Sequence, residues 1–181
     1  MSLLIELYDD LDKDGLIEEL KQFESKDTVV PIGDLIYILN DTMDIELTLF
    51  IMEIFYIRIN DVDDQLMAVY PNVSDVLKRH FIELFAMNSK SKYMQFLLGE
   101  YFNNPYMRPL IRKKCFEQKF YLFINLVRYF EDVKLTDDAI STAQQILKTI
   151  PRDVVLKSGT SFSGTKLMDV YYAISPDDRK K

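Results

Sequence analysis

Apolar side chains recur every three or four residues along nearly all of this 181-residue chain, as in an α-helix that buries one face. The clearest stripe lies in segment 136–150: Ala139, Ile140, Ala143, Ile146, Leu147 and Ile150. A second lies in 74–88: Leu77, Phe81, Leu84 and Phe85. Segments 44–59 and 119–130 are apolar on most sides, which predicts helices covered on more than one side. Strand-like alternation is hard to find, so the pattern predicts an all-α chain.

Prolines divide this pattern into helix pairs. Pro31, Pro71 and Pro105 each stand where a helix can begin, because the first helical N–H has no intrahelical partner. After each of them we expect one helix, a short polar break and a more apolar helix: 32–40 with 44–59, 74–88 with 91–103, and 106–117 with 119–130. Pro31, Pro71, Pro105 and Pro151 are 40, 34 and 46 residues apart. This spacing resembles HEAT and armadillo repeats, in which a helix pair recurs roughly every 40 residues.

The resemblance covers residues 28–150 and implies antiparallel helix pairs stacked as a short superhelix, with an irregular helical bundle as the alternative. Either arrangement needs about 8–10 helices of ordinary length. We expect one all-α domain over 1–175. It comprises N-terminal acidic helices (1–27), the helix-pair array (28–150), and a Gly/Ser-rich loop with a short final helix (151–175). A charged tail, 176–181, follows.

Several features predict a cytoplasmic protein. The sequence starts without the basic segment of a secretory signal. No apolar stretch approaches the roughly 20 residues that a membrane-spanning helix requires. Cys115 is the only cysteine, so no intramolecular disulfide is possible, and a reducing compartment is the default. We therefore expect no membrane association.

Charge is distributed unevenly along the chain. Residues 1–75 carry 18 acidic and 4 basic side chains, whereas residues 76–134 carry 5 acidic and 11 basic ones. The electrostatic field of such an uneven charge distribution steers the approach of charged partners. We consider two interpretations: solvated acidic helices, or a surface that binds a protein with a basic surface. For the second, the candidate residues are acidic side chains of the first third: Asp34, Asp41, Asp44, Glu46, Glu53, Asp61, Asp63 and Asp64.

The positive middle contains a basic segment with aromatic residues between its charges: Arg108, Arg112, Lys113, Lys114, Lys119 and Arg128. Phosphates attract such a segment. However, domains that bind nucleic acid are normally basic as a whole, and this chain has a net charge of −7. Neutralisation of the acidic third is the better interpretation, and we expect no nucleic-acid partner.

Residues 10–21 resemble the calcium loop of an EF-hand. Oxygen-bearing side chains occupy positions 1, 3, 5 and 9, with Gly at position 6: Asp10, Asp12, Asp14, Glu18 and Gly15. Position 12 departs from the pattern, because Lys21 stands where the bidentate Glu belongs. The alternative is a break between two short helices in which Asp12 or Asp14 caps the second. We do not favour a metal site here.

No catalytic arrangement emerges. Residues 159–166 approach a phosphate-binding P-loop, but the Lys and Thr at its end are inverted. His80 is the only histidine, so it has no second His with which to bind a metal. Cys115 follows three cations, Arg112, Lys113 and Lys114, which can lower a thiol pKa, but a nucleophile also needs a base. We predict a protein that is not an enzyme and has no cofactor.

The sequence thus predicts a non-catalytic protein-binding module. A small, acidic helical protein rich in Phe and Tyr resembles the immunity proteins that neutralise bacterial toxins. That resemblance implies binding to a basic toxin through the acidic N-terminal third. The alternatives are an intracellular adaptor or scaffold that holds a peptide or helix, and a calcium-responsive regulator that uses residues 10–18.

Overall fold

The computed structural model describes residues 1–88 and 90–118, and this part of the chain is entirely helical. It contains eight α-helices, two 3-10 turns and no strand: α1 (Leu3–Asp9), α2 (Lys13–Leu20), η1 (Lys21–Glu24), α3 (Ile32–Asp41), α4 (Ile45–Ile57), α5 (Ile59–Val69), η2 (Tyr70–Asn72), α6 (Asp75–Ala86), α7 (Ser91–Asn103) and α8 (Arg108–Glu117). The all-α prediction is confirmed for these residues. None of their helices is long and apolar enough to cross a membrane.

The chain divides into two compact units, residues 1–84 and residues 85–181. The predicted helices 119–130 and 136–150, the loop at 159–166 and the charged tail lie outside the described residues. The single domain over 1–175 and the choice between a superhelix and a bundle remain predictions.

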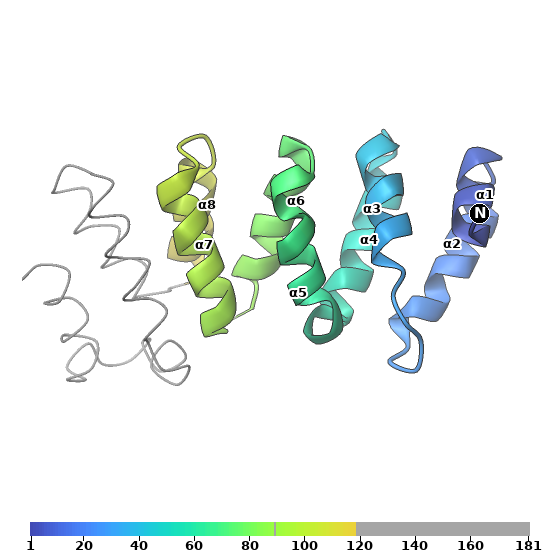
Figure 1. Ribbon diagram of the computed structural model, residues 1–181, viewed down its shortest axis with the longest axis horizontal. Helices are drawn as coiled ribbons and strands as arrows, with labels where there is room; N and C mark the ends of the chain where they lie inside the picture. Colours follow the sequence, from blue (N-terminus) through green and yellow to red (C-terminus); the bar gives the residue numbers. More distant parts are fainter. Residues whose placement is uncertain (89, 119–181) are drawn as a thin grey trace, which may run out of the picture. The chain divides into compact units, whose positions relative to one another are not determined.

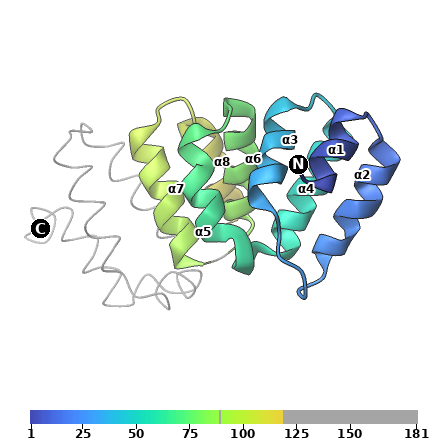
Figure 2. The same ribbon diagram turned by 45° about the vertical axis from the view of Figure 1, so that its right-hand side comes forward.

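In the first unit, helices α1 to α4 form two helical hairpins. Asp10, Leu11 and Asp12 join α1 to α2, and Thr42, Met43 and Asp44 join α3 to α4. Helix α1 contacts α3, and α2 contacts α4, so the hairpins pack side by side in two layers (Figures 1 and 2). Both connecting turns therefore lie at the same end of the hairpins.

An aspartate caps the second helix of each hairpin. The Asp12 carboxylate accepts a hydrogen bond from the N–H of Gly15 at 3.0 Å, and that of Asp44 accepts one from Leu47 at 3.1 Å. Such caps satisfy N–H groups that have no intrahelical partner. A Cβ atom on Gly15 would lie 2.4 Å from Asp12 Oδ2, so a larger residue at position 15 would displace the capping carboxylate from this position.

Helix α5 (Ile59–Val69) was not predicted from the sequence, since no helix was expected between 59 and 74. The stripe of Ile59, Val62 and Leu66 has helical spacing, and all three side chains are buried. An acidic run lies within the same segment and interrupts its apolar pattern, which is why the stripe is easily overlooked.

Two of the proline assignments were also wrong. Pro71 does not stand at the start of a long helix but lies in the 3-10 turn η2. Helix α8 begins at Arg108 rather than beside Pro105, and the proline within its first turn is Pro109. Prolines therefore mark breaks in this chain more reliably than they mark the first residue of a helix.

Arg58 separates α4 from α5 and ties a distant loop to them. Its side chain is buried, and its Nε lies 2.9 Å from Asp61 Oδ2. Its two terminal nitrogens donate hydrogen bonds to the carbonyls of Phe23, Ser25 and Thr28, at 3.0 Å for Phe23 and 2.6 Å for Thr28. A buried cation is tolerated only when its donors are satisfied, as these are.

The core of the first unit is built from the inward faces of these helices. Leu16, Leu35, Ile38 and Ile51 are fully buried. Phe81 of α6 meets Phe55 of α4 edge to face, with ring centroids 6.3 Å apart. The stripe predicted for 74–88 is confirmed, since all four of its members are buried: Leu77, Phe81 and Leu84 of the first unit, and Phe85, the first residue of the second.

The described part of the second unit packs around aromatic rings. Tyr93 of α7 is fully buried and stacks on Phe85, with centroids 5.3 Å apart. Arg108, at the start of α8, donates a hydrogen bond to the carbonyl of Tyr101 at 2.7 Å. Its guanidinium carbon lies 5.8 Å from the centre of the Tyr101 ring. These contacts join α7 to α8.

Candidate functional site

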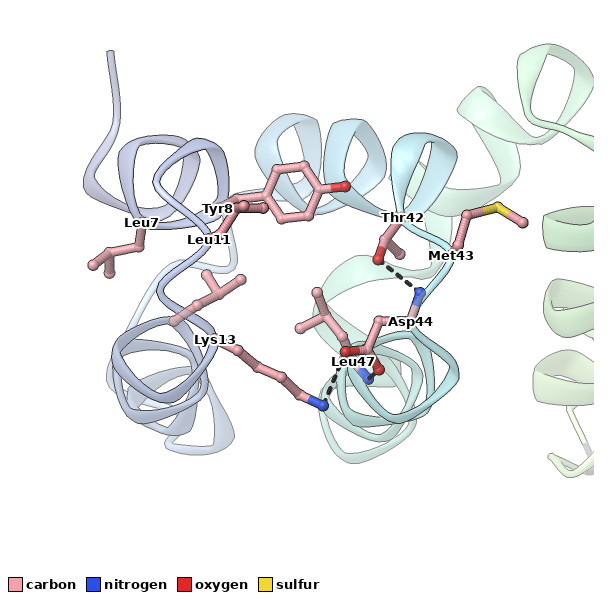
Figure 3. Close-up of a pocket in the computed structure, with 9 residues that line it drawn as sticks. Leu7, Tyr8, Leu11, Lys13, Thr42, Met43, Asp44 and Leu47 are labelled. Atoms are coloured by element: carbon pink, nitrogen blue, oxygen red, sulfur yellow. Dashed lines mark hydrogen bonds and ion pairs between the residues drawn. The ribbon is translucent and has the colours of Figure 1, made fainter.

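A groove of about 350 Å³ lies between the two hairpin turns of the first unit (Figure 3). Its walls come from the end of α1, the start of α2, and the turn that leads into α4. Six of its nine lining residues are apolar or aromatic, and the full set is Leu7, Tyr8, Leu11, Lys13, Leu16, Thr42, Met43, Asp44 and Leu47. A mostly apolar concavity with a few polar groups is the usual form of a binding site.

Leu11, on the rim of the groove, adopts a left-handed backbone conformation with φ = 58°. It occupies the position after the end of α1 where glycine is usual. The N–H of Asp12 donates to the Leu7 carbonyl at 3.0 Å, and the N–H of Leu11 donates to Tyr8 at 3.1 Å, as in a Schellman motif. A leucine here costs about 1–2 kcal/mol of backbone strain. Nevertheless its side chain is 88 % exposed, so the strain is not offset by burial.

Two side chains of the first hairpin, Lys13 and Tyr8, make polar contacts with the second hairpin across the groove. Lys13 Nζ lies 2.9 Å from Asp44 Oδ2 and 2.7 Å from Glu46 Oε2, and the Tyr8 hydroxyl donates to Asp41 Oδ2 at 2.8 Å. Figure 3 shows Lys13 reaching toward Asp44 while Met43 turns away from the groove. These contacts fix the separation of the two turns.

The same contacts shift the pKa values of the groove residues. Hydrogen bonds to Glu46 and Asp44 raise the pKa of Lys13. The hydrogen bond from Lys13, together with the N–H of Leu47, lowers the pKa of Asp44. Burial and the hydrogen bond to Asp41 raise the pKa of Tyr8. At neutral pH, Lys13 and Asp44 are therefore charged and Tyr8 is neutral.

The structure brings together some of the acidic residues predicted to bind a partner. Asp41, Asp44 and Glu46 lie at or beside the turn into α4, next to the groove, and Glu53 is exposed farther along α4. The other candidates lie elsewhere: Asp34 is half-buried in the first turn of α3, and Asp61, Asp63 and Asp64 lie on α5. Asp63 is buried, so it does not contribute to an exposed acidic surface.

The apolar members of this site were not predicted from the sequence. Leu11 and Met43 each stand directly before a capping aspartate, and they are 88 % and 95 % exposed. A hydrophobic residue before the N-cap often packs onto the first turn of the helix. Here neither side chain is covered. In both turns an apolar residue directly precedes the capping aspartate, and this repetition is the one sequence pattern that could have pointed to the site.

The candidate calcium ligands serve local structure instead. Residues 13–20 form helix α2, so they do not make the open loop that an EF-hand requires. Asp12 caps α2, and Glu18 pairs with Lys21 at 2.8 Å. Asp10 ends α1, and Asp14 is exposed in the first turn of α2. No group of three or more potential metal ligands occurs among the described residues.

The structure also places the residues that the sequence offered for catalysis or phosphate binding. Cys115 is fully buried, and burial raises the pKa of its thiol, which is the opposite of the lowering considered from its basic neighbours. His80 is half-buried on α6. In the basic segment, Arg112 lies over the Phe116 ring and Lys114 lies 3.7 Å from Glu117. Lys113 Nζ is 4.0 Å from the same carboxylate, while Lys119 and Arg128 lie outside the described residues.

A comparison with protein-family models finds no matching family, and comparisons with curated proteins and with solved structures find no match either.

Proposed function

We propose that this protein is a non-catalytic protein-binding module whose acidic first unit binds a partner with a basic surface. One observation carries the proposal: an apolar groove whose rim residue, Leu11, is exposed in a strained conformation, with carboxylates in and next to the two turns that form the groove. Residues in or next to the two turns provide them: Asp10, Asp12, Asp14, Asp41, Asp44 and Glu46. Strain without burial is typical of functional sites, where binding rather than folding uses the side chain.

The charge of the first unit supports a basic partner. Its residues 1–75 hold 18 acidic and 4 basic side chains, and three of those four cations are already engaged by carboxylates. Lys13 pairs with Asp44 and Glu46, Lys21 with Glu18, and Arg58 with Asp61. The remaining acidic excess produces a negative field. Such a field accelerates association with a positive protein surface.

An immunity protein that blocks a basic toxin is the most specific form of this proposal. It is supported by the acidity of the first unit and by an apolar groove in which a toxin side chain can be held. Packing of the α1–α2 hairpin on the α3–α4 hairpin supports a HEAT-like arrangement of helix pairs. We place the protein in the cytoplasm, where a chain with a single cysteine needs no disulfide.

The proposal is tested by capture of partners from the native host with wild type and with a charge variant, Asp10→Lys with Asp14→Lys. Both carboxylates are exposed. Mass spectrometry identifies captured proteins, and we expect a basic partner whose recovery falls at least tenfold with the variant. Its association rate should fall steeply as salt increases. A partner captured equally by both proteins, at a rate independent of salt, would overturn the proposal.

A matched control separates charge from damage to the fold. Glu24 and Asp27 are also exposed carboxylates of the first unit, but neither is adjacent in sequence to a residue that lines the groove, whereas Asp10 and Asp14 are next to Leu11 and Lys13. The double variant Glu24→Lys with Asp27→Lys makes the same change in net charge. We expect it to retain most of the partner binding.

A further inference from the structure

Helix α4 is apolar on two opposite faces, and the first unit buries only one of them. Leu47, Ile51, Ile54 and Phe55 make the buried face. On the other side of the helix, large apolar side chains remain accessible: Ile45 at 74 %, Leu49 at 54 % and Tyr56 at 45 %. The sequence predicts a helix that is covered on more than one side. The second apolar side is instead presented to solvent.

These three side chains and the buried Met52 form an apolar stripe along α4, in which Met52 interrupts the exposed surface. Ile45, Leu49, Met52 and Tyr56 follow each other at intervals of four, three and four residues. At 3.6 residues per turn these positions lie within about 60° of one another around the helix, and they extend along it for about 16 Å. Met52, which is 9 % exposed, forms the floor of the stripe. Intervals of three and four are those with which one helix packs along another.

Carboxylates border the stripe on one side. Glu46 and Glu53 are both exposed and are seven residues apart, so they lie on the same side of α4, about 70–90° from the middle of the stripe. In helix pairs, charges that flank an apolar seam select partners of opposite charge. Lys13 contacts one oxygen of Glu46, and a carboxylate accepts further hydrogen bonds. An apolar stripe edged by acids fits a helix that carries Lys or Arg beside its own apolar face.

We propose that this stripe is a docking site for a basic amphipathic helix of a partner protein. The inference rests on the proposed function and deepens it, because it specifies the partner's secondary structure and the side chains that it uses. Leu or Ile side chains of the partner helix pack along Ile45, Leu49, Met52 and Tyr56. Its Lys or Arg side chains pair with Glu46 and Glu53.

The test uses the full chain and a 14-residue probe, acetyl-KLKKLLKKLKKLLK-amide, whose leucines gather on one face when it is helical. A matched peptide, acetyl-KSKKSSKKSKKSSK-amide, has the same charge and no apolar face. Titration calorimetry measures the affinity of both for wild type and for the stripe variant, Leu49→Gln with Tyr56→Gln. The control variant, Val29→Gln with Val76→Gln, changes two exposed apolar residues elsewhere in the unit. Circular dichroism verifies that each variant is folded.

We expect wild type and the control variant to bind the leucine peptide at least tenfold more tightly than the serine peptide. The stripe variant should lose that difference. If wild type binds both peptides equally, or if the stripe variant behaves like wild type, the docking site is wrong.

A charge variant distinguishes an error in the helix docking site from an error in the proposed function. Asp10→Asn with Asp14→Asn reduces the charge beside the groove and leaves the α4 stripe unchanged. If it weakens both peptides while the stripe variant has no effect, the helix site is wrong and the acidic binding surface stands. If neither these substitutions nor added salt affects either peptide, both proposals fail.

Discussion

Lys13 Nζ of α2 lies 2.7 Å from Glu46 Oε2 and 2.9 Å from Asp44 Oδ2 of α4, so one ammonium joins the two hairpins at the groove. The hydrogen bond from Lys13, followed by the N–H of Leu47, lowers the pKa of Asp44 in the folded state. A carboxyl with a lowered pKa contributes stability above its unfolded pKa of about 4 and loses it as the pH falls through the folded value.

We therefore expect acid to weaken the folded state through Asp44. The urea midpoint of wild type should fall between about pH 5 and pH 2, and that of Asp44→Asn should fall less, because the amide does not titrate. Urea denaturation at each pH, followed by circular dichroism, measures both. Asp34→Asn is the control, since Asp34 lies in the first turn of α3, away from the groove. An Asp44→Asn profile as steep as that of wild type would contradict this explanation.

Gly15 and Gly33 are expected to respond in opposite directions to the same substitution. A Cβ at position 15 would lie 2.4 Å from Asp12 Oδ2, so Gly15→Ala displaces the cap of α2 and costs about 1 kcal/mol or more of unfolding free energy. A Cβ at Gly33, in the first turn of α3, meets nothing within 4 Å. Gly33→Ala should therefore stabilise by about 0.5 kcal/mol. Urea denaturation of both variants measures the difference, and equal effects would exclude the steric explanation.

The thiol of Cys115 should be unreactive in the folded protein. It is fully buried, and burial raises its pKa, so the thiolate that attacks alkylating reagents is scarce at pH 8. We expect iodoacetamide to modify native protein at least a hundredfold more slowly than protein in 6 M guanidinium, where the thiol has its ordinary pKa of about 8.5. Mass spectrometry of timed samples gives both rates. Rapid modification of the native protein would show that basic neighbours, rather than burial, control this cysteine.

Periodicity predicted α3, α4, α6 and α7 because the packing of each follows its own three-and-four spacing. It missed α5, since no Pro or Gly separates that helix from α4. The break at Arg58 depends on carbonyls 30–35 residues earlier in the chain, which no local pattern reveals. Charge alone made Asp41, Asp44 and Glu46 candidates for partner binding, and the structure places them in or beside the groove. The groove was not predictable, because it forms where two turns about 30 residues apart meet, and nothing in the sequence marks Leu11 as left-handed.

Removal of the Arg58 guanidinium should destabilise the first unit strongly. Arg58→Met leaves three carbonyls and Asp61 without this donor, and the loss of one member of a buried polar network costs about 3–5 kcal/mol. Arg58→Lys keeps the charge but cannot reach all these acceptors at once, so we expect an intermediate loss. Chemical denaturation gives both values. Asp61→Asn, which keeps an acceptor at an exposed position, should cost far less, and a loss as large as that of Arg58→Met would place the stabilisation in the ion pair alone.

Leu11 offers the sharpest separation of stability from binding. Leu11→Gly relieves the left-handed strain and should raise the unfolding free energy by about 1 kcal/mol, because glycine is the residue that this end of α1 favours. Leu11→Ala removes the side chain but keeps a Cβ in the same conformation, so it should give no such gain. If binding uses the exposed leucine, both variants should bind the captured partner several-fold more weakly although only one is more stable. Urea denaturation and titration of the partner test the pair, and a glycine variant that gains stability without losing affinity would remove Leu11 from the binding surface.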